Sequence, residues 1–396
     1  MRPKLQRIAA ASFLLRTSTA PFWRNNVYIK PTLTYHLPSY FHQVVPSTDT
    51  TTYRSFSTSH TSFLISNNAT ASTTAITEDD HDTDSDTTSV NKIPTPHTAS
   101  DKFQFVAYAA WHPKARQKTT ANNNEKAYWK QATSAGKVDA GEDAFFQTTT
   151  PEGLAIGVAD GVGGWSLVGV DPALFSWTLM DNAATVAKNT KQSINAHDIL
   201  ESAFHELRKS GKVAAGSSTA CILSLSKATG EMTSCNLGDS AFLLVRDQKI
   251  VYESPSQQHY FNCPYQLTVV PETYPNRDEL VTDLPKDADT RKFLLKDGDL
   301  ILLATDGYFD NMYAEETLEI INNGMQSVYN NHNNEEVVTA TIRSLAKTLT
   351  DKARLLSLNP KRMSPWAKAA QAHGSNYRGG KVDDITCIVT FVRHKQ

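Results

Sequence analysis

Three aspartates stand at the edges of apolar segments, where a carboxylate is hard to explain as a packing residue. Asp160 follows the run 154–159, Asp306 follows 299–305, and Asp383 precedes the alternating run 384–392. An aspartate beside a buried strand is costly unless it is paired with a cation or bound to a metal. If these segments converge, their carboxylates form a site for Mg²⁺ or Mn²⁺, which prefer oxygen ligands.

The residues around these aspartates could supply further oxygen ligands. A glycine follows two of them, at positions 161 and 307, so the chain can turn and present a carbonyl such as that of Gly161 to a metal ion. Glu142 and Asp143 add a fourth acidic position. The simpler interpretation is that each Asp-Gly pair is only a turn, and spacing alone leaves both interpretations open.

The elements that would position these residues are short strands interspersed with amphipathic helices. Apolar or alternating runs predict strands at 103–110, 154–159, 217–225, 231–236, 241–246, 250–253, 299–305 and 384–392. Helices are predicted after Asp171-Pro172, before Gly211, at 315–323 and at 335–357. Because several strands follow one another through short connections, the pattern predicts antiparallel pairing and an α+β domain.

The first hundred residues differ from the rest of the chain in composition. They contain none of the 18 glycines and none of the four cysteines. Residues 49–100 are rich in serine and threonine and have too few apolar side chains to offset the entropy of ordering, which predicts a disordered linker. Residues 101–396 then form one domain, long enough to bury a core without disulfides or structural metals.

Residues 1–48 have the composition of a targeting segment. No acidic residue precedes Asp49, whereas six basic residues do: Arg2, Lys4, Arg7, Arg16, Arg24 and Lys30. A basic, Ser-rich, acid-poor segment is typical of a mitochondrial transit peptide. The alternatives are a secretory signal with residues 8–15 as its apolar core and a disordered basic tail.

Composition excludes several classes of protein. Residues 101–396 carry 31 basic and 34 acidic residues, so the domain has no basic field for nucleic acid. No apolar run approaches the ~18–20 residues of a membrane span. The cysteines contain no CxxC pair, which argues against a zinc finger, and their dispersal fits a reducing compartment.

Five motifs in register carry a family resemblance over roughly 103–393. In chain order they are Asp160-Gly-Val-Gly-Gly164, the Gly-Ser-Ser-Thr-Ala run at 216–220, Leu237-Gly-Asp-Ser240, Ala304-Thr-Asp-Gly307 with Asp310-Asn311, and Asp383-Asp-Ile-Thr386. Their order and spacing resemble the metal-dependent protein phosphatases of type 2C, the PPM family. Three further segments resemble its mitochondrial branch: Val170-Asp-Pro172, Gln257-Gln-His-Tyr-Phe-Asn262 and Arg378-Gly-Gly-Lys381.

The resemblance implies two stacked antiparallel sheets flanked by helix pairs, with two Mn²⁺ or Mg²⁺ ions at one end. Asp160 would bridge both ions, Asp306 and Asp383 would complete one, and the Gly161 carbonyl would help to hold the other. The reaction implied is phosphoprotein Ser/Thr dephosphorylation, in which a hydroxide bridging the two ions attacks phosphorus in line. The matching Glu-Asp pair, at 142 and 143, would act directly or through water.

The chain departs from the animal type 2C pattern in three places. Val138 replaces the phosphate-binding arginine, with Lys137 beside it as a possible phosphate contact. Val162 replaces a histidine proposed as general acid, and the segment 212–215 offers no acid for a third ion. These departures leave phosphate anchoring, leaving-group protonation and a third metal open.

Three functions compete on these residues. An active Ser/Thr phosphatase acting on phosphorylated mitochondrial proteins in the matrix is favoured, because all the metal aspartates are present. The alternatives are a catalytically dead scaffold of the same fold and a hydrolase of small phosphoesters. His259 is interpreted as structural, Asp239 as a turn or supporting residue, and Ser240 is not expected to be a nucleophile because it lacks an evident histidine partner. The sequence does not indicate an oligomeric state.

The leader predicts import followed by cleavage. A fusion of residues 1–60 to a fluorescent protein should reach mitochondria and be shortened, because a basic, acid-poor segment is typical of a mitochondrial transit peptide. Replacing Arg2, Lys4 and Arg7 together with Glu should abolish import. A fusion that keeps its full length and stays diffuse in the cytosol would contradict the prediction.

Overall fold

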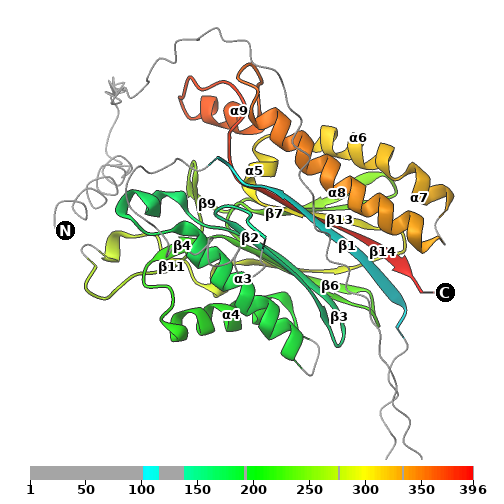
Figure 1. Cartoon of the computed structure of the whole chain (residues 1–396), viewed down its shortest axis with the longest axis horizontal. Helices are drawn as coiled ribbons and strands as arrows, with labels where there is room; N and C mark the ends of the chain where they lie inside the picture. The colour runs from blue at the N-terminus through cyan, green and yellow to red at the C-terminus, as the bar shows by residue number, and fades with distance from the viewer. Residues whose placement is uncertain (1–100, 116–137, 191–193, 275–276, 332–333, 396) are drawn as a thin grey trace, which may run out of the picture. The chain divides into compact units, whose positions relative to one another are not determined.

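The computed structural model describes residues 101–115, 138–190, 194–274, 277–331 and 334–395. These residues build two five-stranded antiparallel sheets packed face to face, with helices on both outer faces (Figure 1). The expected α+β sandwich is therefore confirmed. The predicted transit peptide at 1–48 and linker at 49–100 lie outside the described residues.

The first sheet, sheet A, joins strands from both ends of the domain. Its order is β1-β14-β13-β7-β8. The strands are β1 (Phe103–His112), β14 (Ile385–His394), β13 (Leu300–Ala304), β7 (Ala241–Arg246) and β8 (Lys249–Glu253). The β1 and β14 strands pair over their full length, from Phe103 opposite His394 to His112 opposite Ile385.

The second sheet, sheet B, has the order β12-β6-β5-β3-β2. The strands are β12 (Asp289–Leu294), β6 (Glu231–Leu237), β5 (Ala220–Ser226), β3 (Gly153–Asp160) and β2 (Asp143–Thr150). The register of β2 on β3 places Asp143 opposite Asp160, so two acidic residues meet at one end of this sheet. Two small pairings add β11 (Leu267–Val269) to β4 (Gly216–Ser218), and β10 (Cys263–Pro264) to β9 (Gln258–Tyr260).

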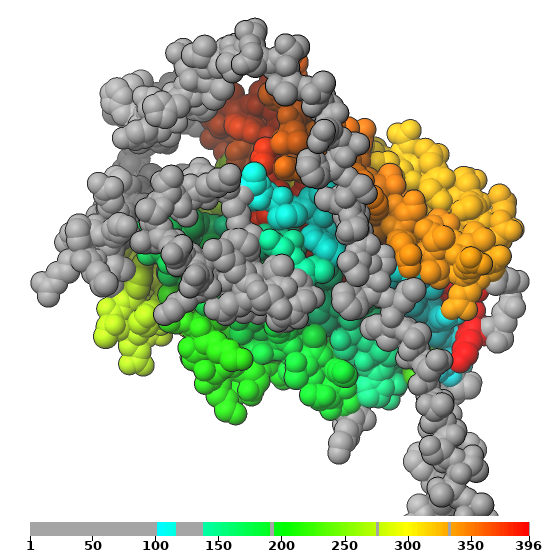
Figure 2. Space-filling model, viewed as in Figure 1, coloured from blue at the N-terminus to red at the C-terminus, as the bar shows by residue number. Residues whose placement is uncertain are grey.

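Three apolar layers hold the sandwich together. The central layer packs the sheets against each other, with Ile156 and Phe242 as examples. A second layer packs sheet B on α3 (Pro172–Asn189) and α4 (Ala196–Ser210). A third packs sheet A on α8 (Glu335–Ser357) and on the shorter helices α5 (Asp306–Phe309), α6 (Ala314–Gly324) and α7 (Gln326–Asn330). Figure 2 shows the two helical layers on opposite sides of the domain.

Local sequence signals explain where the helices begin and end. Asp171 caps α3 by accepting a hydrogen bond from the Ala173 amide, and Pro172 occupies the first helical position, as expected. The last residue of α4 is followed by Gly211, which is left-handed at φ 65°. The 18-residue α3 and 23-residue α8 are the longest helices described, and no described helix is long and apolar enough to span a bilayer.

Two expectations about the strands need correction. The predicted strand 217–225 is divided into β4 and β5 at Thr219, because β4 pairs with β11 in a separate two-stranded sheet whereas β5 pairs with β3 and β6 in sheet B. Strands β6 and β7 do not pair despite their short connection, because β6 lies in sheet B and β7 in sheet A. A short connection can carry the chain from one sheet to the facing sheet as well as into a hairpin.

Some elements were not expected from the sequence. They are β2, β12, the small strands β9 to β11, and the helix α9 (Pro365–Ala372), which Ser364 caps. The exposed side of β12 and the brevity of β9 to β11 leave little apolar periodicity to detect.

A buried ion pair on sheet A gives a stability prediction. Asp299 is fully buried, and Arg246 donates to it from Nε at 2.7 Å and from Nη2 at 2.6 Å. The substitution Arg246→Met should lower the free energy of unfolding by about 3–5 kcal/mol, because it leaves a buried carboxylate without its cation. Urea denaturation measures this change.

The pair of the exposed Arg291 with the partly buried Asp289, 3.0 Å apart, provides the control. Arg291→Met should lower the free energy of unfolding much less than Arg246→Met, because the Arg291 side chain is exposed and solvent screens its ion pair. Equal losses in the two variants would contradict the assignment of a stabilising role to the Arg246–Asp299 pair.

Candidate metal centre

The three aspartates singled out in the sequence lie together at one end of the sandwich. Asp160 is the last residue of β3, Asp306 begins α5 directly after β13, and Asp383 precedes β14. The Lys381 ammonium contacts two of them, at 2.7 Å from Asp306 Oδ2 and 3.2 Å from Asp383 Oδ2. Because β3 belongs to sheet B and the other two strands to sheet A, the cluster spans both sheets.

Asp143 ties the two sheets together beneath this cluster. Its Oδ2 accepts a hydrogen bond of 2.8 Å from Thr305 Oγ1, which belongs to the other sheet's connection into α5. Its Oδ1 is buried without a hydrogen-bond partner in the described structure, and the same holds for Asp306 Oδ1. Buried carboxylate oxygens without partners are what a metal ion would satisfy, so this donor set fits a divalent cation.

Burial and mutual repulsion act on the carboxylates. Burial raises the pKa of Asp160 well above its usual value, and the negative charges of Asp306 and Asp143 raise it further. Burial likewise raises the pKa of Asp143, with Asp384 adding to the shift. Such shifts mean that the charged forms need nearby cations to be stable in the folded protein.

Two lysines provide part of that positive charge. Lys381 contacts Asp306 and Asp383, as described above, and also Asp310 at 2.5 Å. Lys114 lies 2.6 Å from Glu142 and 2.9 Å from Asp383. Burial opposes the charge on Lys114, but Asp383, Asp384 and Glu142 outweigh it and raise its pKa.

These lysines also stabilise one carboxylate in its charged form. Burial opposes the charge of Asp383, but Lys381 and Lys114 outweigh burial and lower its pKa. Neither lysine was predicted as a contact of the acidic cluster, although Lys381 stands in one of the motifs. No local pattern marks Lys114, which comes from the segment after β1. The predicted phosphate contact Lys137 lies outside the described residues.

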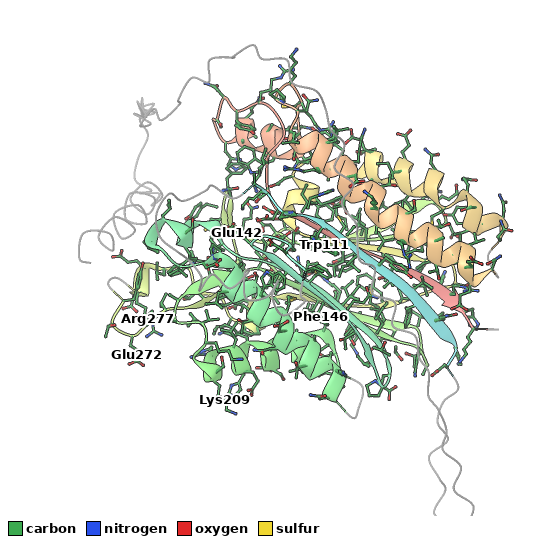
Figure 3. All side chains as sticks on the ribbon, viewed as in Figure 1. Trp111, Glu142, Phe146, Lys209, Glu272 and Arg277 are labelled. Atoms are coloured by element: carbon green, nitrogen blue, oxygen red, sulfur yellow. The ribbon has the colours of Figure 1, made fainter. Side chains whose placement is uncertain are left out.

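The two adjacent acids at the start of β2 have different environments. Asp143 is buried between the sheets, whereas Glu142 is partly exposed at the start of the strand, where Figure 3 labels it. Asp384 holds this region in place by accepting hydrogen bonds from the amides of Lys114, at 2.7 Å, and Glu142, at 3.0 Å. Asp384 is thus a positioning residue that the sequence analysis did not single out.

Two glycines allow the backbone to approach closely at the site. A Cβ at Gly161 would lie 2.4 Å from the Pro172 carbonyl oxygen, and the Gly161 amide donates to the Glu142 carbonyl at 3.0 Å. A Cβ at Gly307 would lie 1.9 Å from the Asp384 carbonyl oxygen. Both positions therefore require glycine, for close packing of the segments that carry the carboxylates.

The weaker candidates have structural partners. His259 Nε2 lies 2.9 Å from Asp283 Oδ2, and its ring stacks on Tyr265 at 4.3 Å. Ser240 is fully buried, 3.1 Å from Thr219 Oγ1, and has no histidine beside it among the residues described. Val162 lies at the start of a 3-10 helix, with its amide bonded to Ser217. These contacts support structural roles for His259 and Ser240.

Asp239, which was predicted to be a turn or supporting residue, lies beside the acidic cluster. It lines a cavity of 420 Å³ together with Asp306 and Asp310. Burial, followed by the negative charge of Asp306, raises the pKa of Asp239 to about 7. The carboxylate cluster therefore continues from the three predicted aspartates into this cavity.

The Asp239 carboxyl predicts a pH dependence for the metal-free protein. Because the folded state raises its pKa, the folded state retains a proton that the unfolded chain releases near pH 4. The stability that the protonated Asp239 carboxyl contributes is therefore lost as pH rises from about 4 to about 7. In EDTA, the free energy of unfolding should fall between about pH 5 and about pH 7.5, and Asp239→Asn should reduce that fall by about 1–2 kcal/mol.

The exposed Asp278 supplies the control for this measurement. Asp278→Asn should leave the pH slope of the urea midpoint unchanged. If Asp239→Asn and the wild-type protein show the same slope, the proposed protonation of Asp239 is wrong.

Comparisons with known proteins agree with this architecture. The family model described as Stage II sporulation protein E (SpoIIE) matches residues 150–358, which include Asp160 and Asp306. The 5-azacytidine resistance protein azr1 of Schizosaccharomyces pombe is 37% identical over 293 residues, covering 74% of this chain and 94% of that protein. The human protein phosphatase PTC7 homolog is 39% identical over 254 residues, covering 64% and 79% respectively.

Among solved structures, the photosystem II phosphatase PBCP is similar over 72% of this chain and 98% of its own, with a TM-score of 0.53 and 26% identity. The sequence similarity to named phosphatases thus agrees with the five motifs, with the two-sheet sandwich and with the acidic centre at its end. The chain belongs to the type 2C family of protein serine/threonine phosphatases.

Proposed function

We propose that this protein removes phosphate from phosphoserine and phosphothreonine with two divalent ions, Mn²⁺ or Mg²⁺, bound mainly by Asp160, Asp306 and Asp383. The observation that supports this most strongly is the convergence of carboxylates from both sheets, with buried oxygens of Asp143 and Asp306 that have no hydrogen-bond partner in the described structure. The Gly161 carbonyl is proposed as a further ligand, because its residue lies between the acidic segments.

The bound ions would supply the positive charge that activates a water for attack on phosphorus and neutralises the phosphate oxygens. The protein's own contribution is to keep the ligands fixed. Thr305 holds Asp143 across the sheets, and Asp384 holds the amides of Lys114 and Glu142. Because these groups are fixed before substrate arrives, the site needs little reorganisation during the reaction.

Glu142 and Asp143 are proposed to act next to the ions in different ways. The carboxylate of Glu142 is partly exposed and paired with Lys114, so it is placed to act through water. Asp143 is buried, is held by Thr305 and lies opposite Asp160 in the β2–β3 register, so it is the better candidate for fixing the position of Asp160.

Lys114 is proposed as the phosphate contact that was expected of Lys137. Its ammonium lies within 3.3 Å of three carboxylates of the centre, and its side chain is 30% exposed. A cation at this place can neutralise a phosphate once metal ions take over the carboxylates. Lys137 stays a prediction.

The substrates are proposed to be phosphorylated proteins of the mitochondrial matrix. The support for this location is the basic, acid-free leader before Asp49. The alternative of a catalytically dead scaffold requires the loss of a metal aspartate, whereas Asp160, Asp306 and Asp383 are all present and lie together.

The metal assignment predicts the outcome of removing one charge. Asp306→Asn and Asp383→Asn should each lower kcat on a phosphoserine peptide at least about a hundredfold, because a neutral amide replaces a charged ligand in a site that works by charge. EDTA should abolish activity of the wild-type protein, and Mn²⁺ or Mg²⁺ should restore it. Isothermal titration should show weaker Mn²⁺ binding in both variants.

Asp289→Asn, on the edge strand β12, is the matched control and should keep wild-type turnover. Both centre variants should stay folded, because Asp306 and Asp383 lie at the end of the sandwich and outside its three packed apolar layers. Turnover near the wild-type rate in either centre variant would refute the metal assignment.

A further inference from the structure

The segment that carries Asp160 and Gly161 is bonded on one side to the short strand β4 and to the residue that follows it. The Asp160 carbonyl accepts hydrogen bonds from the Thr219 amide at 3.0 Å and from Ser218 Oγ at 2.8 Å. The Asp160 amide donates in turn to Thr219 Oγ1 at 3.1 Å. The Gly-Ser-Ser-Thr-Ala run at 216–220, which the metal assignment leaves without a role, therefore holds the backbone of a proposed metal ligand.

The next bond along this segment orients the Gly161 carbonyl. The Val162 amide donates to the Ser217 carbonyl at 3.0 Å. This amide and the Gly161 carbonyl belong to one planar trans peptide group, in which N–H and C=O point in opposite directions. Because the Val162 N–H points toward β4, the Gly161 carbonyl points away from β4. The position of Ser217 thus sets the direction of a proposed metal ligand.

The hydroxyl of the same serine fixes the turn that follows. Trp165 Nε1 donates to Ser217 Oγ at 2.7 Å, and the Trp165 amide donates to the Val162 carbonyl at 3.2 Å. Ser217 and Trp165 are both buried, so their bond is shielded from water. Since Trp165 closes the turn on Val162, a displacement of the indole would also displace the backbone beside Gly161.

The Ser217 hydroxyl connects this turn to a third segment. Ser217 Oγ donates to Gln266 Oε1 at 2.6 Å, and the direction of this bond is determined because the Trp165 indole can only donate. Gln266 is itself held at two points. Its Nε2 donates to the Pro264 carbonyl at 3.1 Å, and its backbone amide donates to Asp283 Oδ2 at 2.8 Å. The side chains of Trp165, Ser217 and Gln266 therefore form one directed chain of hydrogen bonds.

The outer end of this network lies at the surface, on His259. His259 Nε2 lies 2.9 Å from Asp283 Oδ2, and its side chain is 34% exposed. The Asp283 amide also donates to the Gln266 carbonyl at 3.0 Å, so these two residues are bonded in both directions. A buried polar network in which each group has a partner makes its segments rigid. Apolar side chains could fill the same space, but they would not fix the direction of a peptide group.

We propose that Ser217 and Gln266 are positioning residues for the metal ion that the Gly161 carbonyl would bind. They act through the Trp165 indole and the Val162 amide and do not bind the ion themselves. Replacing residues that orient metal ligands commonly weakens metal binding by about 10–100-fold. This inference rests on the proposed function and adds to it two uncharged residues outside the acidic cluster.

The first test measures Mn²⁺ binding to the full chain by isothermal titration. Ser217→Ala, Gln266→Met and Trp165→Phe, which keeps an aromatic ring, each remove part of the network. Each should weaken the binding of one of the two ions about tenfold and leave the binding of the other unchanged. Ser217→Thr retains the hydroxyl and should keep the wild-type affinities. Ser224→Ala removes a comparable bond, from Ser224 Oγ to the Ile194 carbonyl at 2.8 Å, and is the matched control that should bind both ions normally.

The second test separates binding of the ion from binding of the substrate. Turnover of a phosphoserine peptide is measured over a range of Mn²⁺ concentrations. In Gln266→Met, half-maximal activity should require about tenfold more Mn²⁺. The kcat at saturating Mn²⁺ and the KM for the peptide should stay close to the wild-type values, because Gln266 acts on the binding of the ion. A residue with a merely structural role would lower the midpoint of urea denaturation without changing the Mn²⁺ requirement.

The outcomes separate this inference from the proposed function. If Ser217→Ala and Trp165→Phe bind Mn²⁺ as the wild-type protein does, or if Ser224→Ala weakens binding equally, the positioning role is wrong and the phosphatase assignment stands. If the wild-type protein hydrolyses neither p-nitrophenyl phosphate nor any phosphopeptide with Mn²⁺ present, the proposed function fails, and this inference fails with it.

Discussion

Negative charge concentrated at the junction of two sheets is the constraint on which the rest of this structure depends. Asp143 and Asp160 face each other across β2 and β3, and sheet A brings Asp306 and Asp383 to the same place. Burial and repulsion raise the pKa of Asp160 and Asp143. The folded protein must therefore bring cations to this point, and Lys114 and Lys381 meet part of that need.

The acidic centre and the cavity beside it are built from different parts of the fold. The proposed metal ligands lie at the ends of strands whose interiors are fully buried, so their positions are fixed by three packed layers. The cavity walls lie instead on the short β9–β10 hairpin and on α9. Residues on such peripheral segments can change without disturbing the sandwich, because they lie outside its packed layers.

Local signals in the sequence were sufficient for the α+β elements and for the place of the predicted aspartates at strand edges, whereas the two-sheet sandwich was implied by the family resemblance. An apolar run that stops at an acid marks both a strand and its end, as for Asp160 and Asp306. The contacts of Lys114 could not be found in this way, since Asp383 lies 269 residues further along the chain. The passage of the chain from β6 to β7 across the sheets was missed for the same reason, because partner choice depends on packing between distant segments.

The position of β14 in sheet A has a consequence for how the protein folds during its synthesis. This strand lies between β1 and β13, so β1 has no partner in the sheet until β14 has been synthesised (Figure 1). Asp383, two residues before β14, joins the acidic cluster only at that stage. Pairing across nearly the whole domain makes folding slow and leaves the growing chain open. Under the proposed metal assignment, a chain in which β14 has not yet paired would lack the Asp383 ligand and would be inactive.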